Sequence, residues 1–155
     1  MAETANYKTI ATNRRAYHDY TVDDKIECGI ELRGSEVKSI RAGKLAFADS
    51  YARVKDGELW LVGLSISPYN HASLFNHETQ RERKLLVHSQ ELKRLQRRVN
   101  EKGYTLIPLR FYFKRSLVKV ELGLCKGKRE YDKRESIKRK DQKREADREA
   151  RERFR

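Results

Sequence analysis

Apolar residues almost disappear from this 155-residue chain after Lys126. Before that point they recur with clear periods, whereas residues 126–155 contain 14 lysines and arginines, 8 acidic residues and few apolar ones. Those apolar residues are Tyr131, Ile137, Ala146, Ala150 and Phe154. So little apolar surface cannot offset the entropy lost when a segment becomes ordered. We therefore expect a globular domain, residues 1–128, and a basic C-terminal tail, residues 129–155, that is disordered when free.

Positive charge is in excess over the whole chain, whose formal net charge is +13. Such a protein attracts polyanions, and nucleic acid is the commonest polyanion in the cytosol. A membrane surface fits less well, because the basic residues are not paired with a large apolar helical face. For the tail alone, a solvated charged arm is an equally good interpretation, since basic termini are often disordered.

The sequence contains no signature of a membrane span, a metal site or a common catalytic site. No run approaches the roughly 18 apolar residues of a membrane helix, and no signal peptide is present, so we expect a cytoplasmic protein. Cys28 and Cys125 have no metal-ligand spacing, so we expect neither metal nor cofactor. Phosphate-binding and nucleophile motifs are also absent, and we expect no enzymatic activity. A metal-free ribonuclease remains the catalytic alternative, with His18, His71, His77 or His88 as acid and base.

Period-two alternation predicts a mainly β domain. The predicted strands are residues 25–33, 49–55, 58–66, 104–113 and 117–124, and residues 1–10 are expected to be loose. Asp56-Gly57 predicts a hairpin turn, because both residues tolerate positive φ. Pro108 predicts an edge or a bulge, because proline has no N–H for a β-ladder.

Two helices interrupt the predicted strands. Ser35 and Gly43 bracket a short helix at 36–42, and Ser89 and Gly103 bracket another at 90–102. Hairpin-linked strands with a few helices are typical of a small, closed or nearly closed antiparallel barrel. We therefore expect such a barrel, with two or three flanking α-helices.

Several positions are candidate nucleic-acid contacts. Residues 13–20, NRRAYHDY, place Arg14 and His18 beside two tyrosines, which suits phosphate contact and base stacking. A charged helical turn leading into a strand explains the same residues equally well. Lys38 and Arg41 share one face of the first predicted helix. Glu27 and Lys119 point outward from their strands under the period-two pattern.

Four segments in order resemble the successive motifs of the SsrA-binding protein family, also called small protein B. They are NRRAYHDY at 13–20, GIELRGSEVKSIRAG at 29–43, RKLL at 83–86 and KGKREYDKR at 126–134. The resemblance implies an oligonucleotide-binding (OB)-type barrel with flanking helices and a long basic tail. Four motifs in the family's order are far more specific than any one of them.

The resemblance implies an RNA-binding protein of bacterial ribosome rescue, or trans-translation. The barrel would bind the tRNA-like part of transfer-messenger RNA and deliver it to stalled ribosomes. The tail would contact the ribosome by probing the vacant decoding site and message channel of the small subunit. A monomer is expected in the RNA complex. The alternative function is that of a structural ribosomal-type protein that binds ribosomal RNA permanently.

The resemblance also implies roles for individual residues. The RNA-binding surface would include Asn13, Glu27, Leu86, Lys119, Lys126, Gly127 and Lys128, and the ribosome-contacting tail residues would be Tyr131, Asp132, Lys133 and Arg134. Leu86 could equally be a core residue. Tyr131 stands where some family members have histidine, which keeps a ring for stacking but removes a titratable group.

Overall fold

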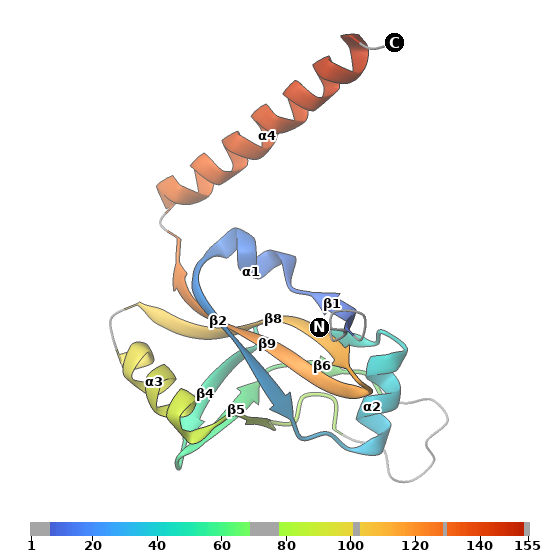
Figure 1. Ribbon diagram of the computed structural model, residues 1–155, viewed down its shortest axis with the longest axis vertical. Coiled ribbons are helices and arrows are strands. Elements are labelled where there is room, and N and C mark those ends of the chain that lie inside the picture. The colour runs from blue at the N-terminus through green and yellow to red at the C-terminus, as the bar shows by residue number, and fades with distance from the viewer. Residues whose placement is uncertain (1–6, 69–77, 101–102, 129, 154–155) are drawn as a thin grey trace.

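The computed structural model describes residues 7–68, 78–100, 103–128 and 130–153, with side chains in the last segment described for 137–152. A curved antiparallel sheet is flanked by three helices, and a fourth helix extends away from it (Figure 1). The helices are α1 (Arg14–Asp19), α2 (Gly34–Arg41), α3 (Ser89–Asn100) and α4 (Glu130–Arg153). The strands are β1 (Tyr7–Thr12), β2 (Tyr20–Ile30), β3 (Leu45–Ala46), β4 (Tyr51–Lys55), β5 (Glu58–Val62), β6 (Ser65–Ile66), β7 (Arg83–Leu86), β8 (Tyr104–Lys114) and β9 (Leu117–Gly127).

The strand pairings run in a ring from β8 through β4, β5, β7, β2 and β9 back to β8, as expected for an OB-like barrel. The main sheet has the order β1-β8-β4-β5-β7-β2-β9, and β9 also pairs with β8. Between β4 and β8 the only register pair is Ala52 with Leu106. The mainly β, barrel-like class predicted from the sequence is therefore confirmed, and the β4–β8 seam is its most weakly paired junction.

The N-terminal strand β1 was not predicted. Tyr7–Thr12 pairs with β8, so the expectation that residues 1–10 are loose is wrong for the described residues 7–10. The predicted irregularity at Pro108 is confirmed, because the β8–β9 register shifts between Pro108 and Arg110. This bulge lets Ile107 and Leu109 pack in a small cluster with α1, while Phe111 enters the main core.

The hairpin predicted at Asp56-Gly57 is also confirmed. Both residues have positive φ, 53° and 73°, and they join β4 to β5. The strand predicted at 58–66 ends early, however, because Gly63 adopts a φ of 83° and redirects the chain before β6. Leu59 and Leu61, rather than Trp60 and Val62, supply the fully buried face of β5.

The two predicted helices are present with shifted starts. At α2 the capping position belongs to Arg33 rather than Ser35: the Arg33 N–H donates to Glu36 Oε1 at 2.8 Å. Glycines at 43 and 103, with φ of 72° and 87°, lie just beyond α2 and α3. On α3, Leu95 is buried and Leu92 and Val99 pack against the core.

A buried ion pair joins α2 to β7. The Glu36 and Arg83 side chains are both fully buried, and Arg83 Nε donates to Glu36 Oε2. The Arg83 guanidinium also donates to the carbonyl oxygens of Leu64 at 2.9 Å and Thr79 at 3.1 Å. Arg81 donates to the same carboxylate. These contacts hold the start of α2, the start of β7 and residues 78–81 together.

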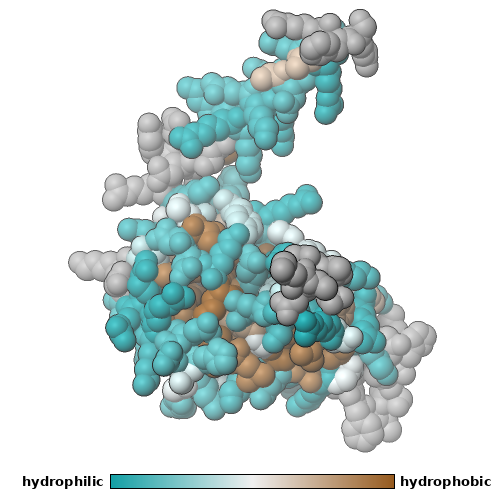
Figure 2. Space-filling model, viewed as in Figure 1, coloured by the Kyte–Doolittle hydropathy of each residue, from teal (hydrophilic) through white to brown (hydrophobic). Residues whose placement is uncertain are grey.

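The tail is helical in this structure, where the sequence predicted a segment that is disordered when free. Helix α4 runs without interruption from Glu130 to Arg153 and contains neither glycine nor proline. Acid-before-base pairs at i and i+4, such as Asp147 with Arg151, each favour a helix by about 0.2–0.5 kcal/mol. Every side chain of residues 137–152 is exposed, and the space-filling view shows the helix as almost wholly hydrophilic (Figure 2). The helix therefore depends on local interactions over these residues.

Candidate nucleic-acid interface

The outward side chains of β2, β8 and β9, together with Leu86 of β7, form one surface, called here the outer strand face. Its accessible members are Glu27, Leu86, Arg110, Lys114 and Lys119, and Tyr112 lies on the same face but is only 2 % exposed. The register places Gly29 opposite both Lys119 and Leu86, and Lys119 opposite Tyr112. Directly opposed residues in antiparallel strands point to the same side. The structure thus brings three predicted contact residues, Glu27, Leu86 and Lys119, onto one face.

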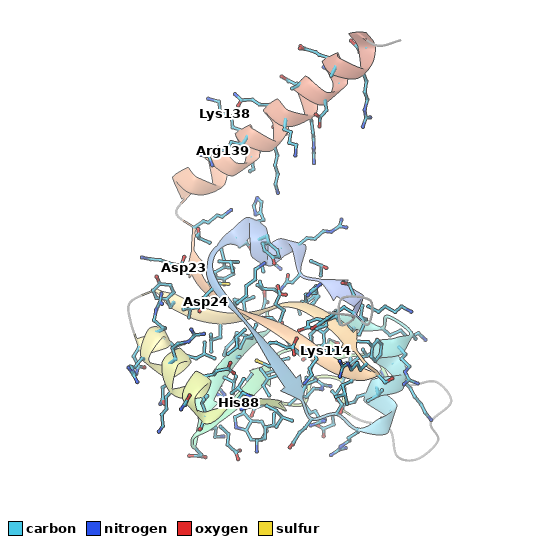
Figure 3. All side chains as sticks on the ribbon, in the orientation of Figure 1. Asp23, Asp24, His88, Lys114, Lys138 and Arg139 are labelled. Carbon is cyan, nitrogen blue, oxygen red and sulfur yellow. The ribbon has the colours of Figure 1, made fainter. Side chains whose placement is uncertain are left out.

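Glu27 is partly buried in this face and accepts two hydrogen bonds. The Tyr112 hydroxyl donates to Oε2, and Lys114 Nζ donates to Oε1 at 3.2 Å. Burial alone would raise the pKa of Glu27, but these donors and the charges of Lys114 and Lys119 hold the pKa below its ordinary value. Glu27 therefore presents a charged acceptor at neutral pH. Figure 3 labels Lys114 on the barrel, well away from Asp23 and Asp24.

Rings and cations alternate beside Glu27. Arg110 lies 4.5 Å and Tyr7 5.7 Å from the Tyr112 ring centroid, and Lys114 Nζ lies 5.4 Å from the Tyr7 centroid. Sequence reasoning missed Tyr7 and Tyr112 as members of the site. The period-two pattern of β8 could have found Tyr112, because Arg110, Tyr112 and Lys114 alternate with inward residues. Tyr7 could not be found in this way, because its strand was not predicted.

Leu86 lies on the surface. It is 46 % exposed, which resolves the alternative that it is a core residue. Its side chain lies over Gly29, where an added Cβ would come within 3.2 Å of Leu86 Cβ. The glycine therefore leaves room for an exposed leucine next to Lys119.

Asn13 is buried, and both ends of its amide are used within the protein. It is 8 % exposed; Nδ2 donates to the Pro108 carbonyl at 2.9 Å, and Oδ1 accepts from the Ala16 N–H at 3.2 Å. Asn13 caps α1 and fastens it to the bulge of β8. The structure thus gives it a supporting position rather than an exposed contact surface.

The other predicted residues of the barrel lie on α1 and α2. Arg14 is exposed at the start of α1, and His18 Nδ1 lies 2.9 Å from Asp19 Oδ1. Lys38 and Arg41 are exposed on α2, with Arg41 5.8 Å from the Phe113 ring centroid. Arg41 thus lies beside β8, the strand that carries Lys114.

The segment from Lys126 to Lys128 connects the barrel to α4. Lys126 is exposed and lies 5.8 Å from the Tyr104 ring centroid. The Lys128 N–H donates to the Asp19 carbonyl at 3.0 Å, and Lys128 Nζ donates to the Tyr17 carbonyl at 3.1 Å. A lysine at these carbonyls places a positive charge at the negative, C-terminal end of the α1 dipole, which is favourable. Gly127, opposite Tyr20, closes the β2–β9 ladder.

Comparison with known proteins identifies the family of this chain. The model of the family described as SmpB protein matches residues 10–152. The chain belongs to the SmpB family. The SsrA-binding protein of Treponema denticola is 52 % identical over 95 % of this chain and 96 % of its own. That of Syntrophobacter fumaroxidans is 57 % identical over 91 % and 88 %.

A solved structure resembles this SmpB-family chain as well. It was presented as "tmRNA-SmpB: a journey to the center of the bacterial ribosome" and has a TM-score of 0.67 and 50 % sequence identity. The match covers 82 % of this chain and 93 % of the other. The resemblance stated from four sequence motifs is thereby confirmed.

The described residues of this SmpB-family chain offer no cluster of three histidine, cysteine or acidic side chains that could hold a metal ion. Cys28 and Cys125 are buried free thiols, and burial raises their pKa to about 12 and about 11. Within the same ranges no helix is long and apolar enough to cross a membrane. His71 and His77 lie outside the described residues.

The four predicted tail residues Tyr131, Asp132, Lys133 and Arg134 lie in the first turns of α4. Their side chains fall outside the described part of the structure. Their proposed contact with the ribosome therefore remains a prediction.

Proposed function

We propose that this protein binds the tRNA-like part of transfer-messenger RNA and delivers it to stalled ribosomes for trans-translation. The observation that carries the proposal is the match along residues 10–152 to a family whose curated members are named SsrA-binding proteins. The protein acts by binding RNA and the ribosome, without covalent chemistry of its own.

The outer strand face supports this function through three kinds of contact. Lys119 offers a cation to a phosphate, which fixes the register of the RNA without reading its sequence. The Glu27 carboxylate accepts from a base amino group or a ribose hydroxyl, and Leu86 offers an apolar surface to an unpaired base. The Tyr7 ring, 39 % exposed, lies against Lys114, which suits a surface that meets both bases and phosphates. Tyr112 is only 2 % exposed and supports Glu27 through its hydroxyl.

The segment from Lys126 to Lys128, which connects the barrel to the tail, supports delivery to the ribosome. Asn13 holds α1 on the barrel, and α1 in turn accepts two hydrogen bonds from Lys128. This arrangement sets where α4 leaves the RNA-binding domain. We assign the tail to the vacant decoding site and message channel, with Tyr131 to Arg134 making the first ribosomal contacts.

The RNA that copurifies with the protein tests this proposal. One dominant transfer-messenger RNA species, absent from a control purification, is the expected result. The alternative, a structural ribosomal protein, predicts stoichiometric presence of the protein in washed ribosomal subunits and no enrichment of that RNA. Sequencing the bound RNA and quantifying the protein on subunits separates the two functions.

Replacement of Lys119 by alanine should weaken binding of transfer-messenger RNA modestly. If the lysine contacts a phosphate, the slope of log affinity against log salt concentration should fall by about one counterion. Fluorescence anisotropy at several salt concentrations measures both quantities. Lys55→Ala is the matched control, because Lys55 is exposed at the β4–β5 hairpin, away from β9. An unchanged slope in a folded Lys119→Ala protein would remove Lys119 from the interface.

Replacement of Glu27 by glutamine should cost about 1–3 kcal/mol of RNA binding free energy without making the salt dependence steeper. The substitution keeps the shape of the side chain but replaces one acceptor oxygen by a donor. Isothermal titration at two salt concentrations is the measurement. Glu58→Gln is a suitable control, since Glu58 pairs with Lys84 at 3.0 Å on another part of the barrel. Equal affinities of the Glu27→Gln and wild-type proteins would contradict the role of Glu27 as an acceptor.

A further inference from the structure

A hollow of about 210 Å³ lies between α1 and the segment that joins β3 to β4. Ala16 and Ile107, 4 % and 5 % exposed, contribute apolar surface to its lining. No member of the outer strand face lines this hollow. It lies next to the weakly paired β4–β8 seam, because Tyr51 and Thr105 line both the hollow and the cleft along that seam.

Ser50 contributes a buried polar atom that lacks a partner. The residue is 4 % exposed, and its hydroxyl has no hydrogen-bond partner within the described part of the chain. Its backbone is held, since the Ser50 N–H donates to the Phe47 carbonyl at 2.9 Å. A buried hydroxyl without a partner destabilises a fold, so such groups are uncommon unless a ligand or water completes them.

Two charged groups stand at the rim. The Asp49 side chain is 95 % exposed, and its Oδ1 lies 3.8 Å from Arg15 Nη1, a loose contact that leaves most of the carboxylate accessible. The Arg15 side chain is 73 % exposed and also lies 3.4 Å from Asp19. A carboxylate accepts two parallel hydrogen bonds, and a guanidinium binds phosphate.

Tyr51 supplies an aromatic ring to the same hollow. It is 38 % exposed and follows Ser50 directly at the start of β4. Unpaired RNA bases bind proteins by stacking on such rings and by hydrogen bonds to their edges. Ring, buried hydroxyl, carboxylate and arginine therefore meet in one small space.

We propose that this hollow binds a single unpaired guanine base of the RNA. Guanine presents two adjacent donors, N1–H and the N2 amino group, to the Asp49 carboxylate, and the acceptors O6 and N7 to the Ser50 hydroxyl. Adenine and cytosine offer an amino group without an adjacent N–H donor on that edge. The ring stacks on Tyr51, and the attached phosphate lies outside near Arg15.

The size of the hollow agrees with one base. Sites for drug-sized ligands usually have about 300–1,000 Å³, and this hollow is smaller. It therefore suits a ring system with its sugar and phosphate outside. This inference rests on the proposed RNA-binding function and adds a second, base-specific contact to the outer strand face.

Ser50→Ala separates binding from folding. Removing a hydroxyl that has no protein partner should leave the melting temperature unchanged or higher, while the affinity for guanosine monophosphate falls about fivefold, the loss of one hydrogen bond. NMR titration of the full-length protein, followed at the amides of Ala16, Ser50 and Tyr51, measures the affinity. Ser39→Ala is the matched control, because Ser39 is equally buried with an unpartnered hydroxyl but lies in α2, outside the hollow.

Asp49→Asn tests the choice of base. The wild-type protein should bind guanosine monophosphate more tightly than adenosine monophosphate, and Asp49→Asn should make the two affinities equal. Transfer-messenger RNA should displace the guanine nucleotide from the wild-type protein. Equal affinities for the two nucleotides in the wild type, an unchanged affinity in Ser50→Ala, or no displacement by RNA would overturn the assignment. If wild-type protein does not bind transfer-messenger RNA at all, the proposed function fails instead.

Discussion

Replacement of Arg83 by alanine is expected to destabilise the protein by about 3–5 kcal/mol, the largest stability effect that we predict for a single substitution. The guanidinium is fully buried and donates to the Glu36 carboxylate and to carbonyl oxygens that include those of Leu64 and Thr79. The substitution leaves the Glu36 carboxylate buried, where it still accepts hydrogen bonds from Arg81 and from the Arg33 N–H. The melting temperature should fall by roughly 10 °C or more for a domain of this size.

The destabilisation caused by Arg83→Ala should depend on pH, because it depends on the ionisation of Glu36. Burial alone would raise its pKa, but Arg81, the Arg33 N–H and Arg83 together hold the pKa below its ordinary value. A carboxyl group with a lowered folded-state pKa stabilises the fold above its unfolded-state pKa, and this contribution is lost as the pH falls through the folded-state pKa. Without Arg83 the pKa of Glu36 rises. The difference in free energy of unfolding between the wild-type and Arg83→Ala proteins should therefore be largest near neutral pH and become smaller in acid.

Two further variants make this prediction specific. Arg53→Ala removes an arginine from an exposed ion pair with Glu82 and should cost less than about 1 kcal/mol. Arg83→Met combined with Glu36→Leu removes both charges and should recover most of the lost stability, because no buried charge is left alone. Urea unfolding at pH 7 and pH 4 measures all four proteins. A loss in Arg83→Ala no larger than in Arg53→Ala would contradict the importance of the buried pair.

Local sequence patterns were sufficient to predict strands β2, β4, β5, β8 and β9 and part of the site. Period-two alternation predicted the outward positions of Glu27 and Lys119, and the antiparallel register then brought both to one face. The Asp56-Gly57 turn and the bulge near Pro108 were likewise predictable, because each depends on the backbone properties of one or two residues.

Features that depend on distant partners could not be predicted in this way. Asn13 is fixed by a carbonyl 95 residues away in the sequence, and Arg83 by a carboxylate 47 residues away. Strand β1 pairs with the edge of β8, and its sequence, YKTIAT, contains β-favouring residues but lacks the alternation of apolar and polar residues that predicted the other strands. The hollow beside Ser50 likewise forms only when α1 and the β3–β4 segment come together.

Truncation after Lys128 is expected to leave the affinity for transfer-messenger RNA within about twofold of that of the full-length protein while abolishing tagging on stalled ribosomes. The proposed RNA contacts lie on the barrel, and the tail begins beyond the Lys128 hydrogen bonds to α1. Affinity is measured by anisotropy, and tagging in a reconstituted translation reaction on a message without a stop codon. The triple variant Asp132→Ala, Lys133→Ala, Arg134→Ala should lose tagging in the same way, although it keeps the length of the tail.

Ala146→Pro distinguishes a helical tail from a merely charged one. The substitution keeps every charge of α4 but places proline in the helix interior, at a cost of about 3 kcal/mol to helix formation. The exposed side chains of residues 137–152 show no packing that would compensate for this cost. If the tail must be helical to occupy an empty message channel, tagging should fall strongly while binding of transfer-messenger RNA persists. Ala146→Ser is the matched control.

Normal tagging by the truncated protein would mean that the tail is only a solvated arm, whereas normal tagging by Ala146→Pro alone would mean that its charge acts without the helix.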